Sequence, residues 1–166
     1  MANFYVITGP AGVGKSTVTK ALAERISKCA ILEGDEIYHQ VFGAVKPWVE
    51  GNHVRLMWKN ILCLAKNYLE AGIDVIVNYI ISKNELENIV QNLKEYEIHF
   101  ACLMAKKETI VFRDEIRPEE EQMHRVDVHL KKFKEYGFDE KFILSTDDKS
   151  PEEEAEEIFS GKFKLD

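Results

Sequence analysis

A stretch near the start of the chain, residues 9–17, constrains the fold more than any other feature. Its sequence GPAGVGKST fits the phosphate-binding loop pattern G-x-x-x-x-G-K-[ST]. The fixed positions of the pattern are filled by Gly9, Gly14, Lys15 and Ser16. Such a loop functions between a strand and a helix, and both flanks comply: residues 3–8 are apolar and β-rich, and residues 16–26 carry apolar side chains at helical spacing. The N-terminus is therefore predicted to form a strand, a phosphate-binding loop and a helix.

The residue types of this loop suit a nucleotide. Its glycines let the backbone turn tightly and point N–H groups at phosphate oxygens, and the helix that follows adds the positive end of its dipole. Lys15 supplies a charge for the outer phosphates, and the Ser16 hydroxyl is a candidate Mg²⁺ ligand. We expect the whole loop to contact the nucleotide: Gly9, Pro10, Ala11, Gly12, Val13, Gly14, Lys15, Ser16 and Thr17.

Length and composition limit the class of protein. The 166 residues suffice for one domain, with 45% hydrophobic and 31% charged residues. The formal net charge is -7 and no stretch of the sequence resembles a basic stripe, so a nucleic-acid partner is not expected. The three cysteines form no CxxC pair, and no apolar run approaches a membrane span. We therefore expect a cytoplasmic protein, a monomer or a homodimer, that has no membrane partner.

Five strand–helix repeats follow one another along the chain. We expect strands over residues 3–8, 29–33, 73–81, 97–105 and 141–144. Helices are predicted over residues 16–26, 36–42, 54–71, 82–96, 107–116, 122–136 and from residue 150 onward. Ser82 with Glu85 and Ser150 with Glu153 form capping boxes, and Gly72 caps the long third helix. This alternation predicts an α/β three-layer sandwich, in which a parallel sheet has helices on both faces.

In such a sheet the ligand lies at the carboxyl ends of the strands, where Asp35 and Asn78 stand. The Asp35 carboxylate is placed to accept a proton from a substrate hydroxyl or to hold Mg²⁺. The alternative is that Asp35 is the N-cap of the short helix that follows.

Arg113 and Arg117 are four residues apart and share a helix face. Two guanidinium groups there suit the charge on a transferring phosphoryl group, which predicts a lid over residues 113–125, with Arg125 a weaker third member. The alternative is a pair of solvated arginines that bridge nearby carboxylates such as those of residues 119–121.

Residues 35–58 are rich in aromatic and hydrogen-bonding side chains and lie where an acceptor would bind. We expect the acceptor to contact Asp35, Tyr38, His39, Arg55 and Asn78. For each of these residues taken singly, ordinary packing is the alternative.

Through residues 9–17, the Glu33-Gly34-Asp35 run and the arginine pair, the chain resembles P-loop kinases of the adenylate-kinase-like group, which includes shikimate and gluconate kinases. The resemblance covers most of the chain. It implies a P-loop NTPase fold with strand order 2-3-1-4-5 and a small lid, and ATP with Mg²⁺ over residues 9–17. It also implies that Asp35 meets the acceptor hydroxyl and that residues 35–58 bind the acceptor. The sequence departs from the group at the third strand, which ends Val77-Asn78-Tyr79 without an acidic residue or a glycine triplet.

Three functions remain open at this point. The first is an ATP-dependent phosphotransferase that acts on a small-molecule hydroxyl, with Lys15, Asp35, Arg113 and Arg117 as catalytic residues and Ser16 and Asp35 at the metal. The second is a nucleoside monophosphate kinase, although Arg55 stands alone in the acceptor segment. The third is an ATP-binding hydrolase or switch. A GTPase would carry D-x-x-G and N-K-x-D, and neither motif occurs.

Overall fold

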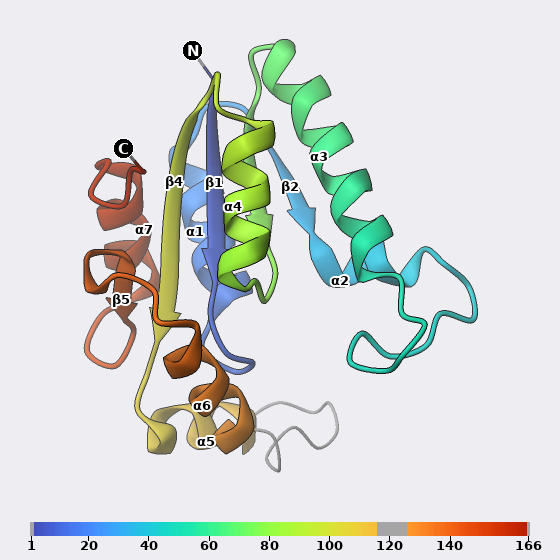
Figure 1. Cartoon of the computed structure of the whole chain (residues 1–166). Helices are drawn as coiled ribbons and strands as arrows, with labels where there is room; N and C mark the ends of the chain where they lie inside the picture. Colours follow the sequence, from blue (N-terminus) through green and yellow to red (C-terminus); the bar gives the residue numbers. More distant parts are fainter. Residues whose placement is uncertain (1, 116–125, 166) are drawn as a thin grey trace.

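A five-stranded parallel sheet forms the centre of the molecule (Figure 1). The computed structural model describes residues 2–115 and 126–165. The strands are β1 (Asn3–Thr8), β2 (Cys29–Glu33), β3 (Asp74–Asn78), β4 (Glu97–Met104) and β5 (Ile143–Ser145). Their order is β2-β3-β1-β4-β5, and every neighbouring pair is parallel, which confirms the predicted topology.

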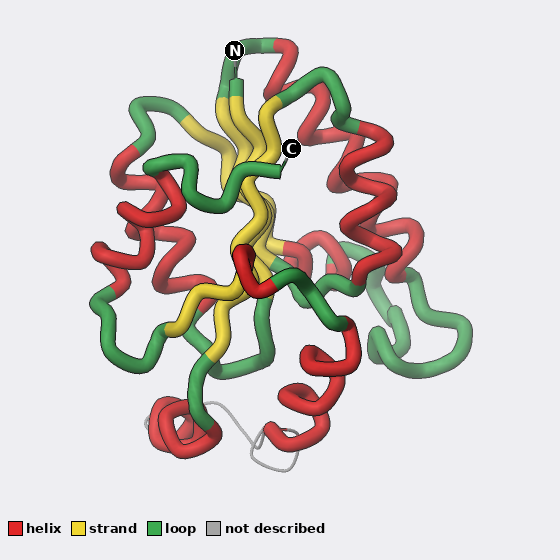
Figure 2. Tube along the Cα trace, turned by 60° about the vertical axis from the view of Figure 1, so that its left-hand side comes forward, coloured by secondary structure: helices red, strands yellow, loops and turns green. Residues whose placement is uncertain are grey.

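Helices cover both faces of this sheet (Figure 2). Helices α1 (Lys15–Arg25) and α7 (Pro151–Phe159) pack against each other on one face, and α3 (Val54–Glu70) and α4 (Lys83–Asn92) lie on the other (Figure 1). The inner strands are nearly continuous apolar runs, as strands covered on both faces require, and Phe4, Ile76 and Phe100 are fully buried. The predicted three-layer arrangement is therefore confirmed.

Three further helices lie at the carboxyl edge of the sheet, where the strand arrows end in Figure 1. The short helix α2 (Gly34–His39) follows β2 directly, and residues 40–53 form turns that lead to α3. Helices α5 (Lys107–Glu115) and α6 (Val126–Tyr136) lie beyond the ends of β1 and β4. The predicted start of α6 at residue 122 lies outside the described residues. None of the helices in the described ranges is long and apolar enough to cross a membrane.

Local capping rules place several helix ends. Ser82 and Glu85 form the predicted capping box of α4, and Ser150 and Glu153 form that of α7. Gly72 has φ 73°, its N–H donates to the Leu69 carbonyl, and the next N–H donates to the Tyr68 carbonyl. These two hydrogen bonds together form the Schellman motif, so the predicted glycine cap of α3 is confirmed.

Two predicted strands and one helix have different limits in the structure. The third strand was expected to reach residue 81 but ends at Asn78, because the Ile81 N–H donates to the Thr8 hydroxyl (3.1 Å) and the chain turns into α4. Helix α4 stops at Asn92 rather than at residue 96. The predicted strand at 141–144 is instead a 3₁₀ turn, η2 (Glu140–Phe142), followed by β5, because the Asp139 carboxylate caps that turn.

Candidate active site

The phosphate-binding loop leaves β1 against the neighbouring strand β4. A Cβ atom added at Gly9, where φ is 147°, would lie 2.4 Å from the Leu103 carbonyl oxygen, so only glycine fits this close approach. Gly14 has φ 107° at the N-cap of α1 and offers no side chain to the first turn. The first N–H groups of α1 therefore face the loop without a side-chain cap, as an anion site requires.

The Lys15 ammonium lies folded over this loop. Its Nζ donates to the carbonyl oxygens of Gly9 (3.1 Å) and Pro10 (3.0 Å). The charge predicted to meet phosphate therefore stands at the mouth of the loop. On the other side, the Ala11 N–H lies 3.5 Å from the His129 Nδ1 of α6, a contact that sequence reasoning missed.

Asn78 lies next to Ser16 at the carboxyl end of β3, and Glu33 ends the neighbouring strand β2. The Asn78 Nδ2 donates to the Ser16 hydroxyl (3.1 Å), and Glu33 is the partner of Asn78 in the strand register. Burial raises the pKa of the Glu33 carboxyl above its ordinary value, while the Asn78 amide and the Lys15 charge oppose that rise. An acidic group is thus present beside the loop, on the strand next to the one where sequence reasoning looked for it.

These oxygen donors fit Mg²⁺. A serine hydroxyl and a carboxylate are hard ligands, and Mg²⁺ bound to a nucleotide takes only one or two protein ligands. Within residues 2–115 and 126–165 no group of three or more histidine, cysteine, aspartate or glutamate side chains could hold a metal ion. Ser16 is exposed in the first turn of α1. Glu33 was not predicted as a ligand; its signal in the sequence is an acidic residue that ends a strand two positions before Asp35.

Asp35 lies in the first turn of α2 and is exposed. The N-cap of α2 is Glu33, so the alternative in which Asp35 is the cap is wrong. Gly34 determines how this turn packs, because a Cβ there would lie 2.4 Å from the Tyr79 ring. Burial raises the pKa of the Tyr79 hydroxyl, and the Asp35 charge adds to the rise, so the two groups are neighbours.

Tyr79 belongs to an aromatic wall whose packing sequence reasoning did not predict, although Tyr79 was expected at the end of the third strand and Trp58 within the acceptor segment 35–58. Its ring packs edge-on against Trp58 of α3, with centroids 6.0 Å apart. The Trp58 Nε1 donates to Glu85 Oε1 (3.2 Å), which ties the wall to the start of α4.

The other predicted acceptor contacts differ in exposure. Tyr38 is 1% exposed, and its hydroxyl donates to the Val45 carbonyl and accepts from the His53 N–H, so it shapes residues 40–53. The His39 Nδ1 lies 2.7 Å from the backbone oxygen of Asp35, on an exposed helix face. Arg55 is exposed in the first turn of α3.

Arg113 joins three parts of the chain. Its guanidinium donates to the Val13 carbonyl (2.9 Å), to the Thr146 hydroxyl (2.8 Å) and to the Thr146 carbonyl (2.7 Å). It therefore clamps the phosphate-binding loop to the segment after β5. Arg117, Arg125 and most of the predicted lid lie outside the described residues.

The segment after β5 is itself ordered by Asp147. The Asp147 carboxylate accepts from the Lys106 N–H (3.0 Å) and the Thr109 hydroxyl (2.7 Å). Burial would raise the pKa of this carboxyl, but these hydrogen bonds outweigh it and lower the pKa below the ordinary value. Residues 145–147 are thereby held beside the loop, where the Thr146 hydroxyl also donates to the Val13 carbonyl (3.2 Å).

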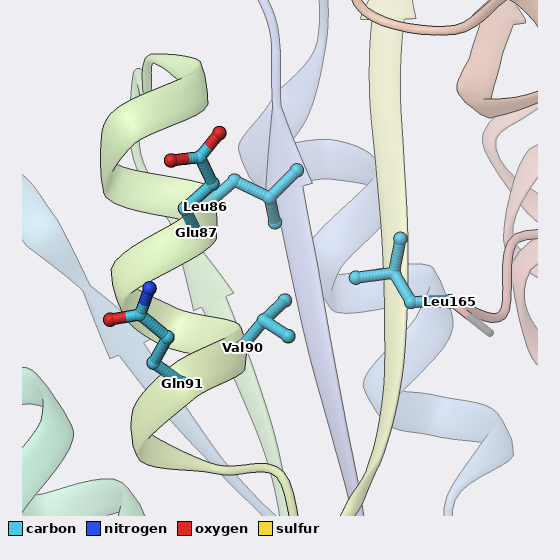
Figure 3. A pocket seen from close by; sticks show the side chains of 5 residues that line it. All are labelled: Leu86, Glu87, Val90, Gln91 and Leu165. Atoms are coloured by element: carbon cyan, nitrogen blue, oxygen red, sulfur yellow. The ribbon is translucent and has the colours of Figure 1, made fainter.

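A hollow elsewhere in the molecule is not part of this site. It lies between α4 and the C-terminal end and is lined by Leu86, Glu87, Val90, Gln91 and Leu165 (Figure 3). Its surface is mainly apolar, and none of the predicted site residues contributes to it.

Comparison with known proteins agrees with this geometry. A family model described as "AAA domain" matches residues 5–137, and no curated protein is significantly similar in sequence. The tunicamycin resistance protein of Deinococcus radiodurans superposes with a TM-score of 0.68 at 20% identity, over 96% of this chain and 95% of its own. A gluconokinase from Sinorhizobium meliloti 1021 superposes with a TM-score of 0.69 at 17% identity, over 96% of this chain and 91% of its own. A shikimate kinase from Bacteroides thetaiotaomicron superposes with a TM-score of 0.68 at 14% identity, over 96% of this chain and 97% of its own. The predicted resemblance to P-loop small-molecule kinases is thereby confirmed at the level of the fold.

Proposed function

The chain belongs to the AAA-domain family, and we propose that it is an ATP-dependent phosphotransferase that moves the γ-phosphoryl group to a hydroxyl of a small molecule. The observation that carries the proposal is that the phosphate-binding loop after β1 and the carboxylates Glu33 and Asp35 after β2 stand at the same carboxyl edge of the parallel sheet. The pKa of Glu33 is affected by the charges of both Asp35 and Lys15. A phosphate donor and a hydroxyl acceptor would meet between these groups.

Each residue has a role that follows from its place. The N–H groups of residues 9–17 and the Lys15 ammonium would hold the β- and γ-phosphates. The Ser16 hydroxyl and the Glu33 carboxylate would hold Mg²⁺, which neutralises phosphate charge when bound. Arg113 would keep the loop in register with residues 145–147, beside the nucleotide base. Arg117 is proposed to reach the transferring group from the lid.

Asp35 would act on the acceptor. Its carboxylate takes the proton of the acceptor hydroxyl as the oxygen forms a bond to the γ-phosphorus and the bond to the bridging oxygen of ADP breaks. The Asp35 side chain is exposed and stands at the first turn of α2, so a small molecule can reach it without rearrangement of the core. Catalysis would rest mainly on positioning and charge neutralisation.

The two other functions have weaker support. A nucleoside monophosphate kinase needs guanidinium groups for the acceptor phosphate, and Arg55 is the one arginine between residues 34 and 70. A hydrolase would need an acidic residue at the end of β3 to orient water, and Asn78 occupies that end.

The test is ADP release by the purified protein with ATP and Mg²⁺, alone and with a panel of alcohols, sugars, nucleosides and nucleoside monophosphates. Mass spectrometry of the mixture identifies any phosphorylated product. We expect an alcohol to stimulate ADP release well above the basal rate and to gain one phosphoryl group. Phosphorylation of nucleoside monophosphates alone would favour the second function, and ATP hydrolysis that no acceptor stimulates would favour the third.

A further inference from the structure

We infer that the acceptor is a hydroxyl compound with an aromatic or apolar part and without negative charge, whose apolar part lies against residues 40–56. This inference rests on the proposed function, because it names the substrate class of the same site. It is carried by two observations: where apolar side chains are exposed, and where carboxylates gather.

Exposed apolar side chains are concentrated beside α2. Twelve large apolar residues of the described part are exposed, and five of them lie within residues 42–56: Phe42, Val45, Trp48, Val49 and Leu56. Phe42 is fully exposed and Trp48 is 58% exposed. Single exposed apolar residues are ordinary, but a concentration of them indicates a binding surface.

This segment is folded and tied to the site. The buried Tyr38 hydroxyl holds it at the Val45 carbonyl and at the His53 N–H. Backbone hydrogen bonds close turns from Val49 to Lys46 (2.9 Å) and from Asn52 to Val49 (3.2 Å). In Figure 1 the segment runs outward from α2 and returns to the start of α3, at the edge of the sheet that carries the site. The segment that carries the exposed side chains therefore lies beside α2, at the carboxyl edge of the sheet.

The acceptor side is also negatively charged. Glu33 ends β2, and Asp35 and Glu36 are exposed in the first turn of α2. Glu85 accepts a hydrogen bond from the Nε1 of Trp58, whose ring packs against Tyr79. None of these four carboxylates forms an ion pair within residues 2–115 and 126–165. The one ammonium of the segment, that of Lys46, lies over the Trp48 ring at 5.4 Å from its centroid. Its one guanidinium, that of Arg55, is exposed in the first turn of α3, so the four carboxylates outnumber these two cations.

The two observations select one occupant. A carboxylate or phosphate on the acceptor would be repelled by the acidic groups, whereas a neutral or ammonium-bearing alcohol would not. The apolar part of such an alcohol would cover the exposed side chains, as apolar walls with few polar groups do in small-molecule sites.

A matched set of alcohols tests the inference. Ligand-observed NMR titrations in the presence of AMP-PNP and Mg²⁺ would compare 2-amino-1-phenylethanol, 1-phenylethanol and mandelate, with 1-amino-2-propanol and lactate as aliphatic counterparts. We expect the aromatic amine to bind at least tenfold more tightly than mandelate and more tightly than 1-amino-2-propanol. Phe42→Ser and Trp48→Ser should weaken the binding of the phenyl compounds several-fold. Glu36→Gln should narrow the difference in affinity between the aromatic amine and mandelate. Phe159→Ser is the control, because Phe159 is exposed on α7.

Equal binding of mandelate, an unchanged affinity of both loop variants, or no binding of any phenyl compound would overturn the inference. A dimer in sedimentation that Phe42→Ser dissociates, without an effect on the alcohols, would also overturn it, because a second copy would then cover the surface. Efficient transfer of phosphate to an anionic acceptor would refute the inference and leave the phosphotransferase intact. Failure to bind a fluorescent ATP analogue would instead refute the proposed function.

Discussion

The Arg113 guanidinium donates a hydrogen bond of 2.9 Å to the carbonyl oxygen of Val13, a residue 100 positions earlier in the chain. The same side chain bonds both the hydroxyl and the carbonyl of Thr146. The phosphate-binding loop, α5 and the segment after β5 are thus joined through one planar, charged group, which offers several donors in a fixed geometry.

Arg113→Lys should therefore weaken ATP binding although it keeps the charge. A lysine ammonium cannot reproduce the planar set of donors that the guanidinium offers. The loss of charged hydrogen bonds costs about 1.5–3 kcal/mol, so we expect the KM for ATP to rise roughly tenfold or more. Steady-state kinetics with a saturating acceptor measure this value. Arg25→Lys on the surface of α1 is the control, and an ATP KM that is the same in both variants would contradict the role of Arg113.

Asp35→Asn should abolish transfer while it spares nucleotide binding. The amide keeps the shape of the side chain but cannot take a proton, so we expect kcat to fall by about 10²- to 10⁴-fold. ATP affinity, measured with a fluorescent analogue, should change little. Glu87→Gln, an exposed change on α4, is the control, and an equal loss of ATP affinity in Asp35→Asn would make Asp35 a metal or folding residue.

Glu33→Gln should change the dependence on magnesium. If the Glu33 carboxylate holds Mg²⁺ together with Ser16, its loss should raise the Mg²⁺ concentration for half-maximal activity about ten- to hundredfold. A titration of activity with Mg²⁺ at fixed ATP measures this shift, with Glu36→Gln as the matched neighbour. A shift of the same size in Glu36→Gln would show that general negative charge, rather than ligation, is responsible.

Glu154 should make the fold less stable as the pH rises. This residue of α7 is 2% exposed, and burial raises its pKa to about 7, although Arg113 and Lys149 oppose the rise. The folded protein therefore holds the proton more firmly than the unfolded chain, whose pKa is near the model-peptide value of 4.5. Its contribution to stability is complete below that value and is lost as the pH rises to about 7, at a total of roughly 3 kcal/mol.

Thermal unfolding between pH 5 and pH 8 checks this expectation. Glu154→Gln should remain neutral, so its melting temperature should fall less over this range than that of the parent protein. Glu24→Gln, an exposed change on α1, should follow the parent. If the melting temperatures of all three proteins changed equally with pH, Glu154 would be ionised in the folded state.

The acceptor side illustrates where sequence reasoning stopped. Asp35 and Tyr79 were both expected near strand ends at this edge, but the packing of the Tyr79 ring was not predicted. Nothing in a linear pattern shows that the Tyr79 ring packs on Gly34, which lies 45 positions earlier. Tyr38, read as an acceptor contact, is buried and holds residues 40–53 through backbone groups.

Local rules determined the features that the sequence alone established. The phosphate-binding loop, the capping boxes at Ser82 and Ser150 and the glycine cap at Gly72 depend on residues within one turn of each other, and the apolar periods identify the core strands. Strand register and side-chain packing decided the rest: Glu33 beside Asn78, Asn78 on Ser16, Tyr79 on Gly34, and Arg113 on Val13. These contacts join residues tens of positions apart, and they exist only because the parallel sheet brings separate strand ends to one edge.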